Sequence, residues 1–299
     1  MGGNEAINNN PSNANFRLST HGSDWLWTTF CIFTVSLLIM VAMAFRRPRG
    51  MRLFHQIAIV VLTTGMLAYF SMASNLGSTP VQTEFRGRGT RQIFFVRYIN
   101  WLITFPLLLL ELLLATPLSL SDIFTTIFMG IVLVIMGLVG ALVTSSFKWG
   151  YFVFGVAALF YVWYILLWHA PRTGTFAAGG VLRRGYMTAA GYLSFLLLLY
   201  PIAWACAEGA NVITVTSEMI WYGILDLFAG PMFLFLFLYE LRDVDYQSFG
   251  LQSGKYTDKS AYNTRQADAP TGSHQNLSRT STAPSPSTAP APANGAERV

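Results

Sequence analysis

The chain has 299 residues, of which 53% are hydrophobic and only 11% are charged, and its formal net charge is +5. Soluble domains are about 25% charged, so this composition excludes an ordinary soluble protein and indicates an integral membrane protein. No basic run interleaved with aromatic residues stands outside the apolar stretches, so we expect no nucleic-acid partner. Cys31 and Cys206 both lie inside apolar stretches, which excludes a disulfide framework.

Residues 1–23 are polar and rich in Asn, and they contain neither the basic segment nor the apolar core of a cleavable signal. We expect them to form a polar extracellular N-terminal segment. From residue 247 the composition changes to Ser, Thr, Pro, Ala and Gly, which cannot bury a core. Residues 247–299 are therefore predicted to be a disordered cytoplasmic tail.

Seven apolar segments lie between these termini, each about as long as an α-helix must be to cross a bilayer. They cover residues 25–45, 53–75, 94–115, 123–143, 151–169, 187–207 and 219–239. Most connections are short, which favours an up-and-down bundle whose successive helices touch. The predicted fold class is an all-α membrane protein with a seven-helix bundle over residues 24–246.

The orientation is predicted from the basic residues in the loops. One side carries Arg46, Arg47, Arg49, Arg52, Arg172, Arg183, Arg184 and Arg242, and the other carries Arg86, Arg88, Arg91 and Lys148. The excess of basic residues normally marks the cytoplasmic side, so we expect an outside N-terminus and a cytoplasmic C-terminus. The three arginines between the second and third segments oppose this assignment.

The third segment carries a row of polar side chains. Arg97, Asn100, Trp101, Thr104 and Glu111 recur at three- and four-residue steps and therefore share one helix face. Such a face is expected to point into the bundle, because a charged group facing lipid is costly. Interhelical hydrogen bonds are one interpretation, and a polar axis that belongs to a functional site is the other.

The seventh segment contains a carboxylate, Asp226, near its middle, and Gly230 follows it one turn later on the same face. An ionisable group at this depth costs about 2.5–3.5 kcal/mol on insertion scales, so it normally faces a partner or a cavity. Asp226 is therefore a candidate functional residue.

Three motifs resemble the signature of the microbial rhodopsins. The third segment reads Arg97-Tyr-Ile-Asn-Trp-Leu-Ile-Thr-Phe-Pro-Leu-Leu-Leu-Leu-Glu111, the sixth contains Tyr200-Pro201-Ile-Ala-Trp204 and Glu208-Gly209, and the seventh contains Leu225-Asp226. The resemblance covers all seven segments. It implies a seven-helix fold with an outside N-terminus and a pocket for retinal.

The departures from this family bear directly on function. The resemblance implies that a lysine one turn after the aspartate carries retinal as a Schiff base, and Gly230 stands at that position here. A Schiff base needs an amine, and the three lysines, Lys148, Lys255 and Lys259, lie outside the predicted spans. Asn100 replaces the aspartate that accepts the Schiff-base proton in the pumps, and an amide cannot ionise.

Other positions of the family's pattern remain or are altered. Leu197 replaces a tryptophan that packs against the retinal ring, and Glu111 stands at the position of the cytoplasmic proton donor. The remnant pocket is predicted to comprise Trp101, Thr104, Leu197, Tyr200, Pro201 and Trp204. Glu208 and Glu218 flank the last loop, where pumps place a proton-release pair, and we expect them to be solvated outer acids.

The substitutions at Gly230 and Asn100 are electrostatically consistent with each other. Loss of the lysine removes one buried positive charge, and the change of one carboxylate to Asn100 removes one negative charge. Arg97 and Asp226 are then left as a predicted buried pair, in contact directly or through water.

The lysine-free pattern resembles the fungal opsin-related proteins of the heat-shock-protein-like branch. That resemblance implies a plasma-membrane protein of the stress response, either a chaperone or a modulator of the proton ATPase. We expect no covalent retinal, no metal, and no enzyme activity, because no nucleophile–base set is present. The expected partners are membrane lipids and other membrane proteins, and the sequence leaves a homo-oligomer open.

Two alternatives stay open at this point. The pocket beside Trp101, Tyr200 and Trp204, enlarged by Gly230 and Leu197, would be a receptor site for non-covalently bound retinal or another lipid. The polar residues of the third segment, together with Asp226, would instead form a light-independent ion or proton pathway.

Overall fold

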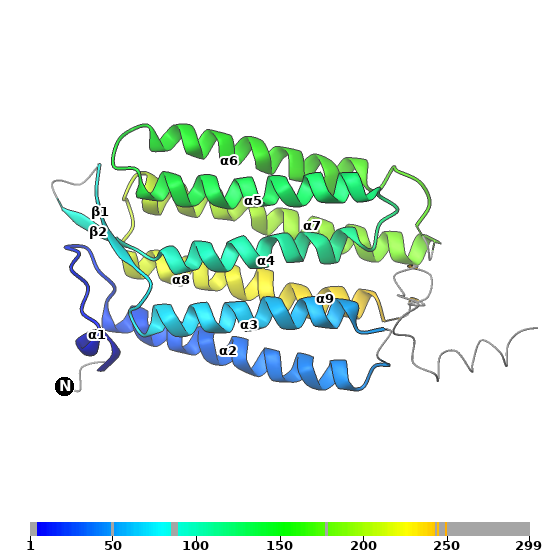
Figure 1. Cartoon of the computed structure of the whole chain (residues 1–299), viewed down its shortest axis with the longest axis horizontal. Coiled ribbons are helices and arrows are strands. Elements are labelled where there is room, and N and C mark those ends of the chain that lie inside the picture. The colour runs from blue at the N-terminus through cyan, green and yellow to red at the C-terminus, as the bar shows by residue number, and fades with distance from the viewer. Residues whose placement is uncertain are drawn as a thin grey trace, which may run out of the picture. The chain divides into compact units, whose positions relative to one another are not determined.

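The computed structural model describes residues 5–48, 51–84, 89–176, 179–242, 244 and 249. The predicted tail, apart from Phe249, lies outside the described residues, and so do Arg49, Arg86, Arg88, Lys255 and Lys259. The described chain forms the seven-helix bundle that the sequence predicts (Figure 1).

The seven spans run antiparallel to their neighbours along the chain (Figure 1). The first three are α2 (Thr20–Phe45), α3 (Leu53–Ala73) and α4 (Phe95–Leu113). The next two are α5 (Leu120–Leu142) and α6 (Lys148–Trp163), which continues as the π-helix η2 (Tyr164–His169). The sixth is α7 (Gly179–Trp204) with η3 (Ala205–Gly209), and the seventh is α8 (Val215–Leu227) with η4 (Phe228–Met232) and α9 (Phe233–Glu240).

Several helices extend beyond the predicted apolar segments. The sixth span begins at Gly179 and includes Arg183 and Arg184, and α6 begins at Lys148, which we had placed in a loop. A hydropathy window stops at charged residues, whereas backbone hydrogen bonding continues until the chain is capped or turned. The side chain of Lys148 is buried, in an ion pair with Glu84.

The N-terminal segment packs on a β-hairpin at one end of the bundle, which we call the hairpin end. Strands β1 (Thr79–Gln82) and β2 (Thr90–Ile93) pair antiparallel between α3 and α4. Phe16 forms a parallel bridge to β2, with its N–H donating to the Thr90 carbonyl at 2.9 Å. Leu18 is buried here, so the segment after α1 (Glu5–Asn9) is anchored before α2 begins at its Ser19 cap.

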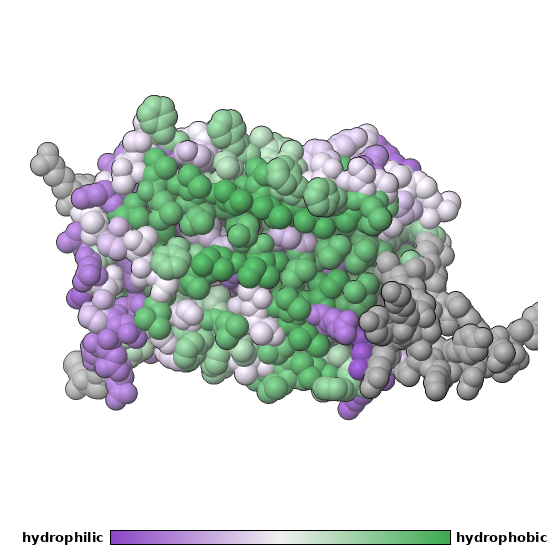
Figure 2. All heavy atoms as spheres, in the orientation of Figure 1, coloured by the Kyte–Doolittle hydropathy of each residue, from purple (hydrophilic) through white to green (hydrophobic). Residues whose placement is uncertain are grey.

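The outer surface of the bundle is apolar. Hydrophobic side chains cover the middle of the face in Figure 2, whereas hydrophilic side chains gather toward the two ends. Large apolar residues on the spans, such as Leu38, Phe124 and Val153, are more than half exposed. A soluble protein rarely exposes so much contiguous apolar surface, so these side chains face lipid and the chain is an integral membrane protein.

An aromatic ring from α2 fills the space beside two glycines. Phe33 stacks on Tyr69 of α3, with ring centroids 5.2 Å apart and an interplanar angle of 20°. A Cβ atom on Gly65 would overlap with the Phe33 ring, and one on Gly230 would lie 3.1 Å from Phe33 Cε1. The absence of side chains at these two positions therefore allows the ring to lie between α3 and η4.

We predict that Gly65→Ala destabilises the protein, because the added methyl group displaces the Phe33 ring. Overpacking of this kind costs about 1–3 kcal/mol, which a lower melting temperature in detergent would report. The matched control is Gly191→Ala on α7, where an added Cβ meets no atom within 4 Å. Equal melting temperatures for the two variants would contradict the assignment of Phe33 as a tightly fitted ring.

Candidate functional site

Two arginines and two glutamates form a buried ion cluster at the hairpin end. Arg97 on α4 is fully buried, and its Nη2 donates to Glu208 of η3 and to Glu218 of α8, the latter at 2.7 Å. Glu218 also accepts from Nη2 of Arg91, the second residue of β2, at 2.5 Å. The outer ion cluster of Arg91, Arg97, Glu208 and Glu218 therefore contains two positive and two negative charges.

Aromatic and hydroxyl groups complete the surroundings of this cluster. The Tyr98 hydroxyl donates to Glu208 at 2.8 Å, and the Tyr222 hydroxyl donates to its other carboxylate oxygen at 3.2 Å. The Arg97 guanidinium lies over the Tyr222 ring, 4.1 Å from the centroid. Buried charges need both a counter-charge and hydrogen bonds, and the outer ion cluster has both.

Our expectation that Glu208 and Glu218 are solvated is wrong. Glu208 is 4% exposed and Glu218 is 0% exposed. The hairpin folds over the end of the bundle and carries Arg91 inward, where its guanidinium pairs with Glu218. Of the three arginines that oppose the charge rule in the loop before the third span, Arg91 is therefore ion-paired inside the protein, while Arg86 and Arg88 lie outside the described residues.

Asp226 accepts three hydrogen bonds from neutral donors. The Tyr69 hydroxyl donates at 2.7 Å, the Tyr200 hydroxyl at 2.6 Å and the Trp101 indole N–H at 2.9 Å. Of the Arg97–Asp226 interaction that we predicted, direct or through water, the direct form is wrong, because Asp226 accepts from these donors and Arg97 binds the two glutamates. The physical reason is that Glu208 and Glu218 are buried and closer to the guanidinium, leaving Asp226 to hydroxyl and indole donors.

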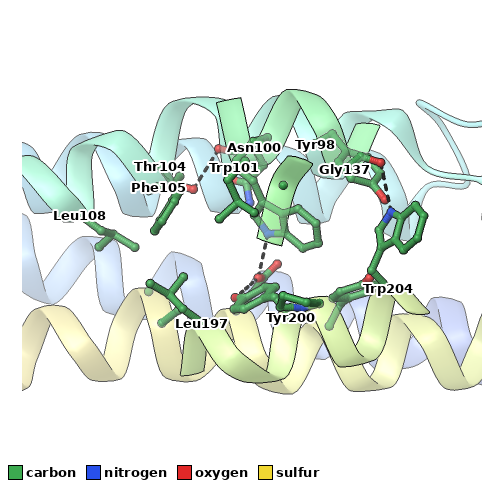
Figure 3. Close-up of a pocket in the computed structure, with 18 of the residues that line it drawn as sticks. Tyr98, Asn100, Trp101, Thr104, Phe105, Leu108, Gly137, Leu197, Tyr200 and Trp204 are labelled. Carbon is green, nitrogen blue, oxygen red and sulfur yellow. Dashed lines mark hydrogen bonds between the residues drawn. The ribbon is translucent and has the colours of Figure 1, made fainter. Parts of the chain in front are cut away.

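A cavity of about 120 Å³ lies beside Asp226 in the middle of the bundle. In Figure 3, Asn100, Trp101 and Thr104 of α4 face Leu197, Tyr200 and Trp204 of α7 across it. The structure therefore brings together all the residues of the predicted remnant pocket, with Asn100, Asp226 and Gly230 in the same lining. The full predicted pocket set on this lining is Trp101, Thr104, Leu197, Tyr200, Pro201 and Trp204.

Aromatic rings hold the walls of this cavity in place. Trp101 makes edge contacts with Tyr200 at 5.2 Å and with Tyr222 at 5.0 Å between ring centroids. Trp204 stacks on Phe152 of α6 and donates its indole N–H to the Gly137 carbonyl at 3.0 Å. Such contacts leave the cavity mostly apolar, with its polar atoms confined to a few positions.

The side-chain oxygens of two candidate polar residues have no hydrogen-bond partner among the described residues. Asn100 is buried on the cavity lining, and its side-chain oxygen accepts no hydrogen bond there, while its backbone carbonyl accepts from the Thr104 hydroxyl. Glu111 is 0% exposed, and neither carboxylate oxygen has a hydrogen-bond partner in the described part of the chain. Glu111 does not line the cavity. The predicted polar row of α4 therefore does not form one continuous site.

The residues around Gly230 do not fit a covalently attached retinal. Glycine supplies no amine, and a Cβ atom at position 230 would lie 3.1 Å from the Phe33 ring, which would have to shift to admit a side chain. Lys148, at the first position of α6, pairs with Glu84 at 3.1 Å and donates to the Glu208 carbonyl at 3.3 Å. Within the described residues, no lysine lies on the cavity lining.

The architecture and the match of residues 20–244 to the family described as "Bacteriorhodopsin-like protein" decide the classification. The chain belongs to this family. Its structure is similar to that of the light-driven proton pump rhodopsin of Coccomyxa subellipsoidea, with a TM-score of 0.72 and 32% identity over 75% of this chain and 98% of the other.

Its sequence relatives are fungal opsin-related proteins. It is 78% identical to Protein FDD123 of Trametes versicolor over 89% of this chain and 94% of that protein. It is 40% identical to the Opsin-like protein carO of Fusarium fujikuroi, over 83% of this chain and 84% of that protein. The 30 kDa heat shock protein of Saccharomyces cerevisiae is 31% identical, over 75% of this chain and 74% of that protein.

Sequence reasoning missed three residues that shape the site. Phe33, Tyr69 and Arg91 come from segments whose motifs gave no functional signal. Tyr69 lies on a span that shows only a continuous apolar pattern, so its hydrogen bond to Asp226 was not predictable from spacing. The signal for Phe33 was indirect, namely two glycines, Gly65 and Gly230, in helix interiors where glycine is otherwise unfavourable.

We predict that Arg97→Gln lowers the free energy of unfolding by about 3–5 kcal/mol, because it leaves buried carboxylates without their cation. Arg17→Gln, an exposed change at the hairpin end, is the control and should cost about 0–1 kcal/mol. Denaturation of double variants then identifies the partner. The losses of unfolding free energy should be non-additive when Arg97→Gln is combined with Glu208→Gln. They should be nearly additive when Arg97→Gln is combined with Asp226→Asn. The opposite pattern would show that Arg97 interacts with Asp226 and not with Glu208.

Proposed function

We propose that this opsin-related membrane protein forms no retinal Schiff base, is not a light-driven pump, and acts in the stress response through other membrane proteins. The observation that carries the proposal is the composition of the site around Gly230. A Schiff base requires an amine, and the Gly230 side of the cavity offers a glycine and an aromatic ring.

The remaining groups of the cavity support the same conclusion. Asn100 cannot take up a proton as a carboxylate can, and Asp226 already accepts hydrogen bonds from Tyr69, Trp101 and Tyr200. The outer ion cluster is charge-balanced without any further cation. Asp226 is thus the only carboxylate among the described residues of the cavity lining, and no lysine or second carboxylate stands beside it there.

The stress-related part of the proposal is supported by relatives, among them the yeast 30 kDa heat shock protein. We propose a chaperone or modulator role toward plasma-membrane proteins such as the proton ATPase. The proposed orientation has the N-terminus outside and the C-terminus in the cytoplasm. It is supported by arginines such as Arg46, Arg47 and Arg172 at the end opposite the hairpin, while Arg91 and Lys148 at the hairpin end are ion-paired.

A second candidate function is a receptor that binds retinal or another lipid non-covalently. The cavity supports it, since it is largely apolar and contains one buried acceptor without a partner, the side-chain oxygen of Asn100. The Phe33 ring limits the ligand, because it occupies the space that we had assigned to an enlargement at Gly230. A ligand would therefore lie between α4 and α7.

We predict that the purified protein mixed with all-trans retinal shows no visible band red-shifted from free retinal, because no amine lines the cavity. Gly230→Lys alone should form little pigment, since the new side chain meets Phe33. Phe33→Ala with Gly230→Lys should form more, and Phe33→Ala alone is the control without an amine. A red-shifted band in the unaltered protein would overturn the proposal. Equal pigment in the single and double lysine variants would show that Phe33 is no obstacle.

We further predict that the protein slows the thermal inactivation of the plasma-membrane proton ATPase in proteoliposomes. A chaperone that contacts the native pump stabilises it by mass action, so ATP hydrolysis should persist longer on heating. The control is an unrelated seven-helix protein at the same protein-to-lipid ratio. Identical decay of ATP hydrolysis in both preparations would remove the ATPase as a partner, while leaving the absence of a Schiff base untouched.

A further inference from the structure

A second cavity, of about 180 Å³, lies at the end of the bundle opposite the hairpin. The loop after α2, the first turn of α3 and the end of α9 enclose it, which places it where three membrane spans begin or end. That depth is the boundary between the hydrocarbon core and the lipid headgroups. Much of the lining is apolar, with Phe54, Leu238 and Leu241 as examples, and its two basic side chains are Arg47 and His55.

A buried imidazole nitrogen of His55 supports a ligand site at this cavity. The residue is 6% exposed, and its Nδ1 has no hydrogen-bond partner among the described residues. Buried polar atoms normally have a hydrogen-bond partner, so an unpartnered one on a residue that lines a cavity points to a missing group. Arg47 and His55 line the same cavity, so two basic side chains border one space. Together they favour an anion.

The N-terminus of α3 adds to the positive potential at this cavity. Its N-cap residue is Arg52, which makes no side-chain capping hydrogen bond, and its first turn contains no acidic residue. By contrast, α5 and α8 are capped by Ser119 and Thr214, and each has an acid in its first turn. Within α3 itself, no capping side chain or first-turn acid offsets the partial positive charge of the helix dipole, which favours an anion at this end.

We propose that this cavity binds the phosphate headgroup of an anionic phospholipid. Arg47 and His55 donate hydrogen bonds to phosphate oxygens, the first turn of α3 contributes its dipole, and the apolar lining receives the adjoining acyl chains. A lipid fits better than a soluble phosphate because the cavity lies at headgroup depth and is largely apolar. The proposed orientation of the chain places it in the cytoplasmic leaflet, where anionic lipids are concentrated.

The test uses the purified full-length protein in phosphatidylcholine nanodiscs with and without phosphatidic acid. We expect phosphatidic acid to raise the melting temperature, and native mass spectrometry to detect the bound lipid. Arg47→Gln and His55→Ala should each weaken binding about tenfold or more, as expected for a lost charge-assisted hydrogen bond. Arg46→Gln is the matched control, because Arg46 is the exposed neighbour of Arg47 and does not line the cavity.

Three results would overturn the proposal. The first is no stabilisation by phosphatidic acid. The second is an equal loss of affinity in Arg46→Gln and Arg47→Gln, which would mean that loop charge alone attracts the lipid. The third is equal stabilisation by glycerol 3-phosphate, which carries the same phosphate without acyl chains and would identify a soluble ligand. Arg47 is exposed, so its variant remains informative if His55→Ala fails to fold.

Discussion

The outer ion cluster is the constraint on which the rest of this structure depends. A fully buried Arg97 is tolerable only if its charge is balanced in place, and two glutamates and Arg91 bring the sum to zero. This requirement ties the N-terminal segment, the hairpin and the ends of three spans together, since the four residues come from β2, α4, η3 and α8. Ion pairs therefore hold the elements together at the hairpin end, whereas the sides of the bundle present apolar side chains to lipid.

Because Arg97 pairs directly with Glu208 and Glu218 at the hairpin end, Asp226 makes no direct ion pair with it. The carboxylate instead organises the middle of the bundle, where Tyr69, Trp101 and Tyr200 from three different helices converge on it. The same region contains Phe33, which packs against Gly230. The glycine at position 230 thus has a packing role, because it leaves room for that ring. The cavity beside Asp226 has aromatic walls, and no lysine lies on its lining in the part of the chain that the structure describes.

Much of the architecture was predictable because it rests on local properties of the chain. Hydropathy and segment length indicated seven spans, since each span must satisfy its own backbone hydrogen bonds in lipid. The three- and four-residue spacing of the polar residues from Arg97 to Glu111 indicated a buried face. Lys148 was wrongly predicted to lie in a loop, although it begins a helix. Glu208 and Glu218 were wrongly predicted to be solvated, because their burial depends on a hairpin that a hydropathy pattern does not reveal.

The sequence by itself determined the membrane class, the seven membrane-spanning segments, the family membership suggested by three motifs, and the absence of an amine at position 230. These follow from composition and from residue identity, which no fold can alter. Only the tertiary structure decided which charges pair, which ring fills the space beside Gly230, and which polar atoms lack partners, as at His55. Pairing and packing depend on distances between segments far apart along the chain, and a single sequence does not contain those distances.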